Sequence, residues 1–192
     1  MITAIILAAG QSKRMGRPKM ILPWGETTVL GQVIATFEAA GVEDILVVIG
    51  GDGELLEASL GDSVRTVFNP DYANGEMLSS IQAGLAELKP EVEAVLIGLG
   101  DQPQVRERSV QSVLEEYTQS KASLIVPSFQ MRRGHPWLMA RQHWEEIQSM
   151  HFPESPREFL NLHANDICYV EVDDPGILKD LDTPEDYLQS RP

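Results

Sequence analysis

Near its N-terminus the chain reads AIILAAGQSKRMGRPK over residues 4–19, an apolar run followed at once by a loop with two glycines and four cations. The run at residues 4–8 has the length and composition of a buried strand. Gly10 and Gly16 allow the loop backbone to approach a ligand and to turn N–H groups toward an anion. A strand that leads into such a loop is typical of an α/β protein that binds its ligand at the carboxyl edge of a parallel sheet.

Strand and helix patterns then alternate along the chain. Apolar runs that predict strands buried on both faces lie at residues 4–8, 45–49, 64–68, 95–99, 124–127 and 167–172. Helical patterns lie between them at residues 29–40, 55–60, 77–88 and 105–119. After residue 127 the pattern weakens to a loop-like segment 131–136, a helix at 141–148, a Pro-bounded segment 152–160 and a short helix after Pro184.

This alternation predicts an α/β fold with a doubly wound, mostly parallel sheet and helices on both faces. The length of 192 residues fits one domain, and we expect it to span residues 1–192. Function is then expected in the loops directly after the strands.

Composition excludes several classes of protein. The net charge of −14 opposes general binding to nucleic acid, because a phosphate backbone would be repelled. Cys168 is the single cysteine and cannot form an internal disulfide. The apolar run at residues 2–9 has no signal-peptide flank and is too short to span a bilayer. We therefore expect a soluble, cytoplasmic protein with no membrane association.

The loop after the first strand reverses the overall charge locally. Residues 13–19 contain four of the chain's 15 Lys and Arg residues, whereas an even distribution would place roughly half a cation there. The four are Lys13, Arg14, Arg17 and Lys19. Such a cluster can neutralise a triphosphate beside a nucleophile. The alternative is a solvated turn with surface cations. The spacing is neither that of a P-loop nor GxGxxG, which removes the main sequence support for an ATPase or a dinucleotide-binding dehydrogenase.

The pattern LAAGxSxRMGxxK at residues 7–19 resembles the signature loop of nucleotidyltransferases that act on sugar phosphates and on the molybdenum cofactor. Further stretches narrow the match, namely LPWG at 22–25, NPDYANG at 69–75, GDQP at 100–103, RGHP at 133–136 and DLDTPED at 180–186. Nearly the whole chain is therefore similar to the molybdenum cofactor guanylyl- and cytidylyltransferase family, and within it to the cytidylyl-transferring members.

The resemblance implies a Rossmann-like nucleotidyltransferase that transfers CMP from CTP to the terminal phosphate of a molybdopterin-type cofactor, with Mg²⁺ as cofactor and pyrophosphate as second product. A molybdenum hydroxylase that receives the product is an implied partner. Residues 1–127 would bind nucleotide, and residues 128–192 would bind the acceptor and return to the sheet. We expect catalytic roles for Arg14, Lys19 and Asp101. The expected nucleotide-binding residues are Leu7, Ala8, Ala9, Gly10, Ser12, Arg14, Gly16, Lys19, Asn69, Ser79, Ser80 and Asp101.

Carboxylates are the candidate magnesium ligands. Asp101 follows the strand at 95–99, where carboxylates of an α/β sheet can hold an ion at phosphate oxygens. Its alternative role is to cap the helix at 105–119 or to form a turn, and either role could coexist with metal binding. The resemblance implies that Asp182 is the second ligand. The residues alone, without the resemblance, indicate only that Asp182 or Thr183 is a helix cap before Pro184. Asp180 and Asp186 are interpreted as surface charges.

The short polar residues that follow the third predicted strand are candidates for ribose or base binding: Asn69, Asn74, Ser79 and Ser80. Turn and capping chemistry is the alternative for them.

A second cationic region contains Arg132, Arg133 and His135, with Arg141 further on. Because transfer between two anions needs a separate site for the acceptor phosphate, we assign Arg133 and His135 to the acceptor. His135 has an alternative role in fixing the Gly-His-Pro turn.

Rival functions are a transferase that uses another nucleotide or a sugar phosphate, and a non-transferring pterin carrier or reductase on the same fold.

Overall fold

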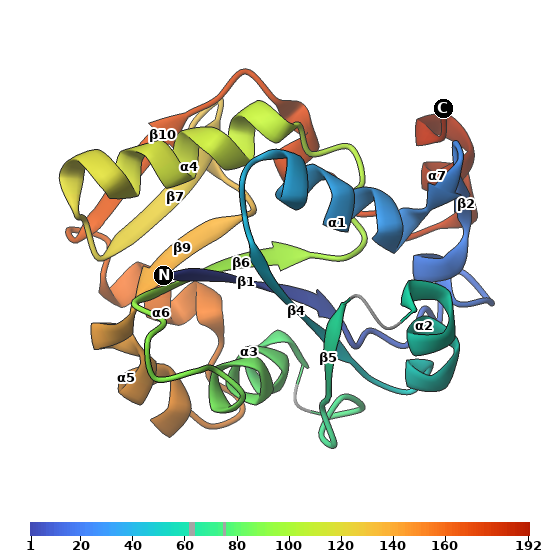
Figure 1. Ribbon diagram of the computed structural model, residues 1–192, viewed down its shortest axis with the longest axis horizontal. Coiled ribbons are helices and arrows are strands. Elements are labelled where there is room, and N and C mark those ends of the chain that lie inside the picture. Colours follow the sequence, from blue (N-terminus) through green and yellow to red (C-terminus); the bar gives the residue numbers. More distant parts are fainter. Residues whose placement is uncertain (62–63, 75) are drawn as a thin grey trace.

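The computed structural model describes residues 1–61, 64–74 and 76–192, so Gly75 of the NPDYANG stretch lies outside the described residues. Its main sheet has eight strands in the order β10-β7-β9-β6-β1-β4-β5, with β8 paired to β7 (Figure 1). The strands are β1 (Ile2–Ala8), β4 (Asp44–Ile49), β5 (Arg65–Phe68), β6 (Ala94–Leu99), β7 (Leu124–Phe129), β8 (Arg132–Arg133), β9 (Trp137–Ala140) and β10 (Ile167–Glu171). A separate antiparallel hairpin joins β2 (Pro23–Trp24) and β3 (Thr27–Thr28).

Helices cover both faces of this sheet. Side chains alternate along β1, so Ile6 packs in one buried cluster with helices α1 (Val29–Ala39), α2 (Gly53–Leu60) and α4 (Glu107–Ser120). Ile5 packs in the other with α3 (Glu76–Ala86), α5 (Trp144–Ser149) and α6 (Pro156–Leu162). The remaining helical segments are η1 (Lys19–Ile21), η2 (Arg141–His143), η3 (Pro175–Leu178) and α7 (Pro184–Ser190).

The structure confirms the predicted doubly wound, mostly parallel α/β sheet and corrects two details. β9 was not predicted: it lies antiparallel between β6 and β7, within the segment after residue 127 where the sequence pattern weakens. Its Trp137, Leu138 and Met139 are buried, but a four-residue run is too short to show a period. The edge strand β5 is not buried on both faces, and Phe68 at its end is 54% exposed.

A third, small cluster ties the C-terminus to the N-terminal loop. Tyr187 of α7 packs with Met15 and Trp24, and its hydroxyl donates to the Pro23 carbonyl oxygen at 2.6 Å. Thr183 caps α7 and forms a capping box with Asp186, so the structure assigns the capping role to Thr183 rather than Asp182. The segment that carries Asp182 is thereby held against the loop.

No helix in the described ranges is long and apolar enough to cross a membrane.

Candidate active site

The loop that follows β1 folds around Ser12. Ser12 has a positive φ of 48°, and its Oγ accepts a hydrogen bond from the Lys19 N–H at 3.1 Å. Gly16 also has a positive φ, of 66°, a backbone conformation that glycine adopts without strain. The loop borders an open cleft of about 340 Å³, lined by Gly10, Gln11, Ser12, Lys13, Arg14, Lys19, Tyr72, Ala73 and Asp182.

Lys19 stands at the centre of a charge cluster. Its residue is only 7% exposed, and its Nζ lies 2.5 Å from Asp101 Oδ2 and 3.3 Å from Asp182 Oδ1. Arg14 Nη2 donates to Asp182 Oδ2 at 3.0 Å. The fold thus brings together Arg14, Lys19, Asp101 and Asp182 from three distant parts of the chain.

Backbone and side-chain hydrogen bonds hold the two acidic segments in place. The Leu181 N–H donates to the Asp101 carbonyl oxygen at 3.0 Å, and Gln102 Nε2 donates to Asp180 Oδ1 at 2.8 Å. Burial, then repulsion from Asp101, raises the pKa of Asp180. Asp180 is exposed, in agreement with its interpretation as a surface charge, and it also interacts electrostatically with Asp101, Asp182 and Lys19.

Asp101 does not cap α4, so the capping alternative is wrong, but Asp101 does lie in a turn, as the second alternative proposed. The N-cap residue of α4 is Arg106, and the carboxylate that accepts from its N–H belongs to Asp174, at 2.9 Å. Asp186 has a structural role, since hydrogen bonds from Thr183 lower its pKa.

A second cleft, of about 290 Å³, lies between the loop and α3. Of the predicted nucleotide residues, Leu7, Ala9, Gly10, Lys19, Ser80 and Asp101 line it. Ala8 packs in the buried cluster on the opposite face of the sheet, so its side chain does not line this cleft. Tyr72 lines both clefts. It was not predicted as a site residue and appears above only within the NPDYANG stretch.

Asn69 uses its amide inside the protein. Its Nδ2 donates to Ser79 Oγ at 2.9 Å and to Ser80 Oγ at 3.0 Å, and its Oδ1 accepts from the Asp71 N–H. The turn-and-cap alternative therefore accounts for all polar side-chain atoms of Asn69. Ser80 lines the second cleft, and Ser79 lines a pocket described below.

The predicted acceptor residues line a pocket of about 590 Å³ between β7, β8 and α6. Arg133 Nε donates to the Tyr169 hydroxyl and Nη1 donates to Asn161 Oδ1, both at 2.8 Å. Burial lowers the pKa of His135 to about 4, so at neutral pH its imidazole adds no charge to this region. Gly134 is required at the turn, because a Cβ there would lie 2.5 Å from the Ile177 carbonyl oxygen.

Arg141 does not belong to this region, which corrects the predicted cationic cluster. Its Nε donates to the Val92 carbonyl oxygen at 2.8 Å, and its guanidinium lies 4.4 Å from the centroid of the Trp144 ring. Because β9 runs antiparallel to β6, the chain after residue 140 has returned to the amino edge of the sheet.

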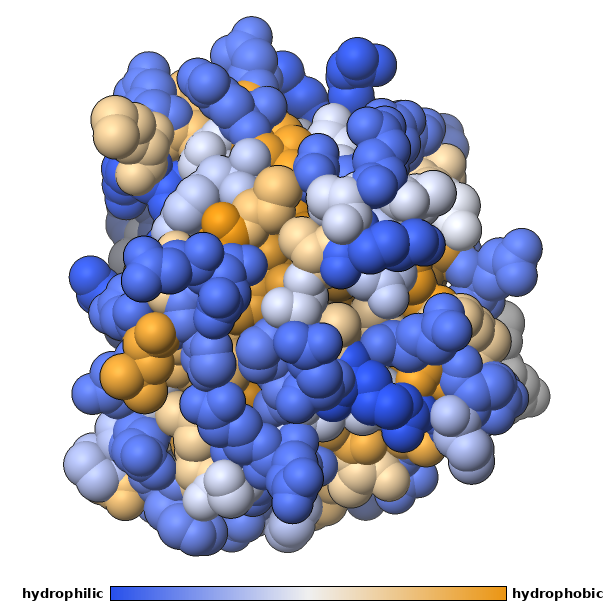
Figure 2. All heavy atoms as spheres, turned by 90° about the vertical axis from the view of Figure 1, so that its left-hand side faces the viewer, coloured by the Kyte–Doolittle hydropathy of each residue, from blue (hydrophilic) through white to orange (hydrophobic). Residues whose placement is uncertain are grey.

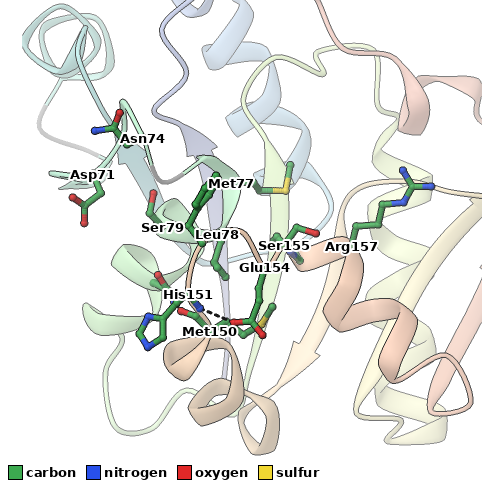
Figure 3. Close-up of a pocket in the computed structure, with 13 residues that line it drawn as sticks. Asp71, Asn74, Met77, Leu78, Ser79, Met150, His151, Glu154, Ser155 and Arg157 are labelled. Atoms are coloured by element: carbon green, nitrogen blue, oxygen red, sulfur yellow. Dashed lines mark hydrogen bonds between the residues drawn. The ribbon is translucent and has the colours of Figure 1, made fainter.

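A further pocket of about 510 Å³ adjoins the pocket that Arg133 and His135 line (Figure 3). In this view α3 supplies Met77, Leu78 and Ser79, and Arg157 extends from α6. Met77 lines this pocket, the pocket beside Arg133 and the second cleft, so the three meet at its side chain. Neither Met77 nor Arg157 was predicted to line a pocket, because an isolated Met or Arg on a helix carries no sequence signal for a site.

Comparison with known proteins decides the family. Residues 4–167 match the model of the MobA-like NTP transferase domain. The chain belongs to this family. This MobA-like chain is 29% identical to the molybdenum cofactor cytidylyltransferase of Escherichia coli K12, over 99% of this chain and 95% of that protein. It is also 28% identical to the nicotine blue oxidoreductase of Paenarthrobacter nicotinovorans, over 96% and 93% of the two chains.

Solved structures agree with the fold of the MobA-like chain. Rv0371c from Mycobacterium tuberculosis H37Rv superposes with a TM-score of 0.87 at 28% identity, covering 98% of this chain and 95% of that one. A complex of Rv0371c with manganese superposes with a TM-score of 0.77 at 26% identity, covering 98% and 96%. The family and fold confirm the predicted nucleotidyltransferase.

Proposed function

We propose that this chain transfers CMP from CTP to the terminal phosphate of a molybdopterin-type cofactor. A phosphate oxygen of the acceptor would attack the α-phosphorus of CTP, and the bond from that phosphorus to the β-phosphate bridge would break, releasing pyrophosphate. The observation that carries the proposal is the meeting of Lys19, Asp101 and Asp182 beside the glycine loop. The likeness to the cytidylyltransferase over nearly the full length supports CTP and the pterin acceptor.

The charge cluster fits a divalent ion. Asp101 and Asp182 both lie within 3.3 Å of Lys19 Nζ, so their carboxylates are close enough to share one ion. Carboxylate oxygens are the ligands that Mg²⁺ and Mn²⁺ prefer. When bound, such an ion would polarise the phosphoryl oxygens and stabilise the charge of the leaving pyrophosphate.

The cationic residues of the site would position the triphosphate and neutralise its charge. Arg14 would hold the triphosphate with a planar fork of donors, and Lys19 with a point charge. The acceptor phosphate is already anionic near neutral pH, so it needs no general base. This agrees with the neutral His135, which would shape the turn beside Arg133 rather than bind phosphate by charge. The product would pass to a molybdenum hydroxylase.

The first test compares nucleotides. Ala9 is buried and lines the second cleft, where its methyl group narrows the space available to a purine. We expect kcat/KM for CTP to exceed that for GTP by about a hundredfold, since a steric clash or an unpaired polar edge discriminates by a few kcal/mol. Pyrophosphate release is measured with each of the four nucleotides and a molybdopterin-type acceptor. Equal values for CTP and GTP would contradict the assignment.

The second test separates acceptor from donor. Arg133→Ala removes a guanidinium of the acceptor pocket, and we expect it to raise the acceptor KM about tenfold to a hundredfold while the Kd for CTP stays constant. Tyr169→Phe keeps the guanidinium but removes its hydroxyl partner, so a purely structural role would make both variants equally impaired. Arg108→Ala on the exposed surface of α4 is the control. Unchanged acceptor binding in Arg133→Ala rules out the assignment.

A second candidate function is reduction, which the likeness to the nicotine blue oxidoreductase favours. It predicts oxidation of NAD(P)H, followed by absorbance, without any need for CTP. Pyrophosphate release that depends on the acceptor supports the transferase instead.

A further inference from the structure

A cluster of two histidines and one glutamate lies away from the nucleotide clefts. His143 ends η2, Glu146 lies in α5, and His163 is the C-cap residue of α6. Ser123, which contacts His143, directly precedes β7. The cluster is therefore at the amino edge of the sheet, the side that Figure 2 faces, whereas the glycine loop follows the carboxyl end of β1 (Figure 1). This face is mostly hydrophilic in Figure 2, with smaller hydrophobic areas between the polar side chains.

The three side chains have the geometry of a ligand set. One ligand atom from each of His143, Glu146 and His163 lies within 4.8 Å of the other two. The two imidazole rings have centroids 4.9 Å apart and meet at 71°. Ligands of one tetrahedral zinc ion lie about 3.4 Å from each other, given bonds of about 2.1 Å. An inward movement of about 1 Å would close the set, and Glu146, an exposed residue, has room to make it.

Each imidazole also has a partner on its other nitrogen. His163 Nδ1 lies 3.3 Å from Asp166 Oδ2, and its Nε2 faces Glu146 Oε2 at 2.9 Å. His143 Nε2 lies 2.9 Å from Ser123 Oγ, which leaves Nδ1 for a metal. Histidines that bind metals characteristically have such an outer acceptor, which fixes the ring and its tautomer. The Phe159 ring packs against both imidazoles, with centroids 5.6 Å and 4.7 Å away.

A simple ion pair between His163 and Glu146 explains only part of this arrangement. It does not use His143, whose buried imidazole is held beside His163 where a second cation would be unfavourable. A metal ion would use all three groups, because neutral imidazole nitrogens and a carboxylate oxygen are the donors that Zn²⁺, Co²⁺ and Ni²⁺ accept.

We propose that His143, Glu146 and His163 bind one divalent transition-metal ion, with Zn²⁺ the best match to the donor set and water completing the coordination. The ion would link α5, α6 and the segment before β7, so its effect is on stability and it takes no part in the transfer reaction. The proposal is independent of the proposed function.

The test uses the full chain, stripped of metal and kept in excess Mg²⁺ so that the carboxylates near Lys19 do not compete for zinc. Titration with Zn²⁺ is expected to show one bound equivalent by calorimetry and to shift the imidazole NMR signals of His143 and His163. At a hundredfold excess over Kd, the thermal midpoint should rise by about 5–10 °C.

Variants decide between the metal site and the ion pair. Glu146→Gln and His163→Gln are expected to weaken zinc binding at least tenfold to a hundredfold and to abolish the thermal shift, and Asp166→Asn to weaken binding about tenfold. Glu145→Gln and His151→Gln, exposed neighbours of the same residue types, are the matched controls. Should a variant fail to fold, the NMR shifts of the unaltered chain still answer the question. No zinc binding, or binding that these substitutions leave unchanged, overturns the proposal.

Discussion

Asp101→Asn is expected to lower kcat by a hundredfold to several thousandfold. The substitution keeps the shape of the side chain but removes one of the two carboxylates placed to hold a divalent ion, and loss of that ion's charge stabilisation costs about 3–5 kcal/mol in the transition state. The measurement is kcat at saturating CTP and acceptor, repeated over a range of Mg²⁺ and Mn²⁺ concentrations. A metal role predicts that the variant also needs more metal for half-maximal rate.

The fold of the variant should survive. The asparagine oxygen can still accept a hydrogen bond from Lys19, which also keeps its contact with Asp182 at 3.3 Å. Removing the Asp101 charge also removes a repulsion on the Asp180 carboxylate, because the Asp101 charge helps to raise the pKa of Asp180. We therefore expect the thermal midpoint to change by only a few degrees. Asp173→Asn, at an exposed position, is the control. A folded Asp101→Asn protein with kcat within threefold of normal would remove Asp101 from the mechanism.

Sequence patterns within a single segment predicted those parts of the site that one segment forms by itself. An apolar run followed by glycines predicted the strand at 4–8 and its loop. The position of Asp101 directly after another predicted strand placed it at the same edge of the sheet. That Lys19 turns inward onto Asp101 was not predictable, because four cations in one loop look alike until the fold buries one of them.

Such patterns could not predict contacts between segments that are far apart in the sequence. Asp182 reaches the loop only because the Leu181 N–H bonds to the Asp101 carbonyl oxygen and α7 packs on the β2–β3 hairpin. The sequence alone gave no spacing that links these segments, and only the family resemblance pointed to Asp182. Arg141 shows the opposite error: it is near Arg133 in sequence, but the unpredicted β9 carries the chain across the sheet between them.

Lys19→Met is expected to have the second large effect, lowering kcat/KM for CTP by about a hundredfold to a thousandfold. The methionine fills the same space but cannot neutralise the triphosphate, and one charge-assisted donor is worth about 1.5–3 kcal/mol in binding, with a further loss in the transition state. Acceptor binding, measured by titration without CTP, should stay constant. Arg17→Met is the matched control, because Arg17 is an exposed cation of the same loop that lines neither cleft.

Stability gives Lys19→Met a second, independent readout. The Lys19 cation counteracts the burial and the repulsion from Asp101 that raise the pKa of Asp180, so its removal should raise that pKa further. A carboxyl whose pKa is higher in the folded state than in the unfolded state favours folding at low pH and opposes it once ionised. The variant should therefore lose more stability at pH 8 than at pH 5, because an ionised Asp180 opposes folding more strongly once the Lys19 cation is gone. Thermal midpoints at both pH values measure this difference. An equal loss of stability at pH 5 and pH 8 would show that Lys19 acts by packing and not by charge.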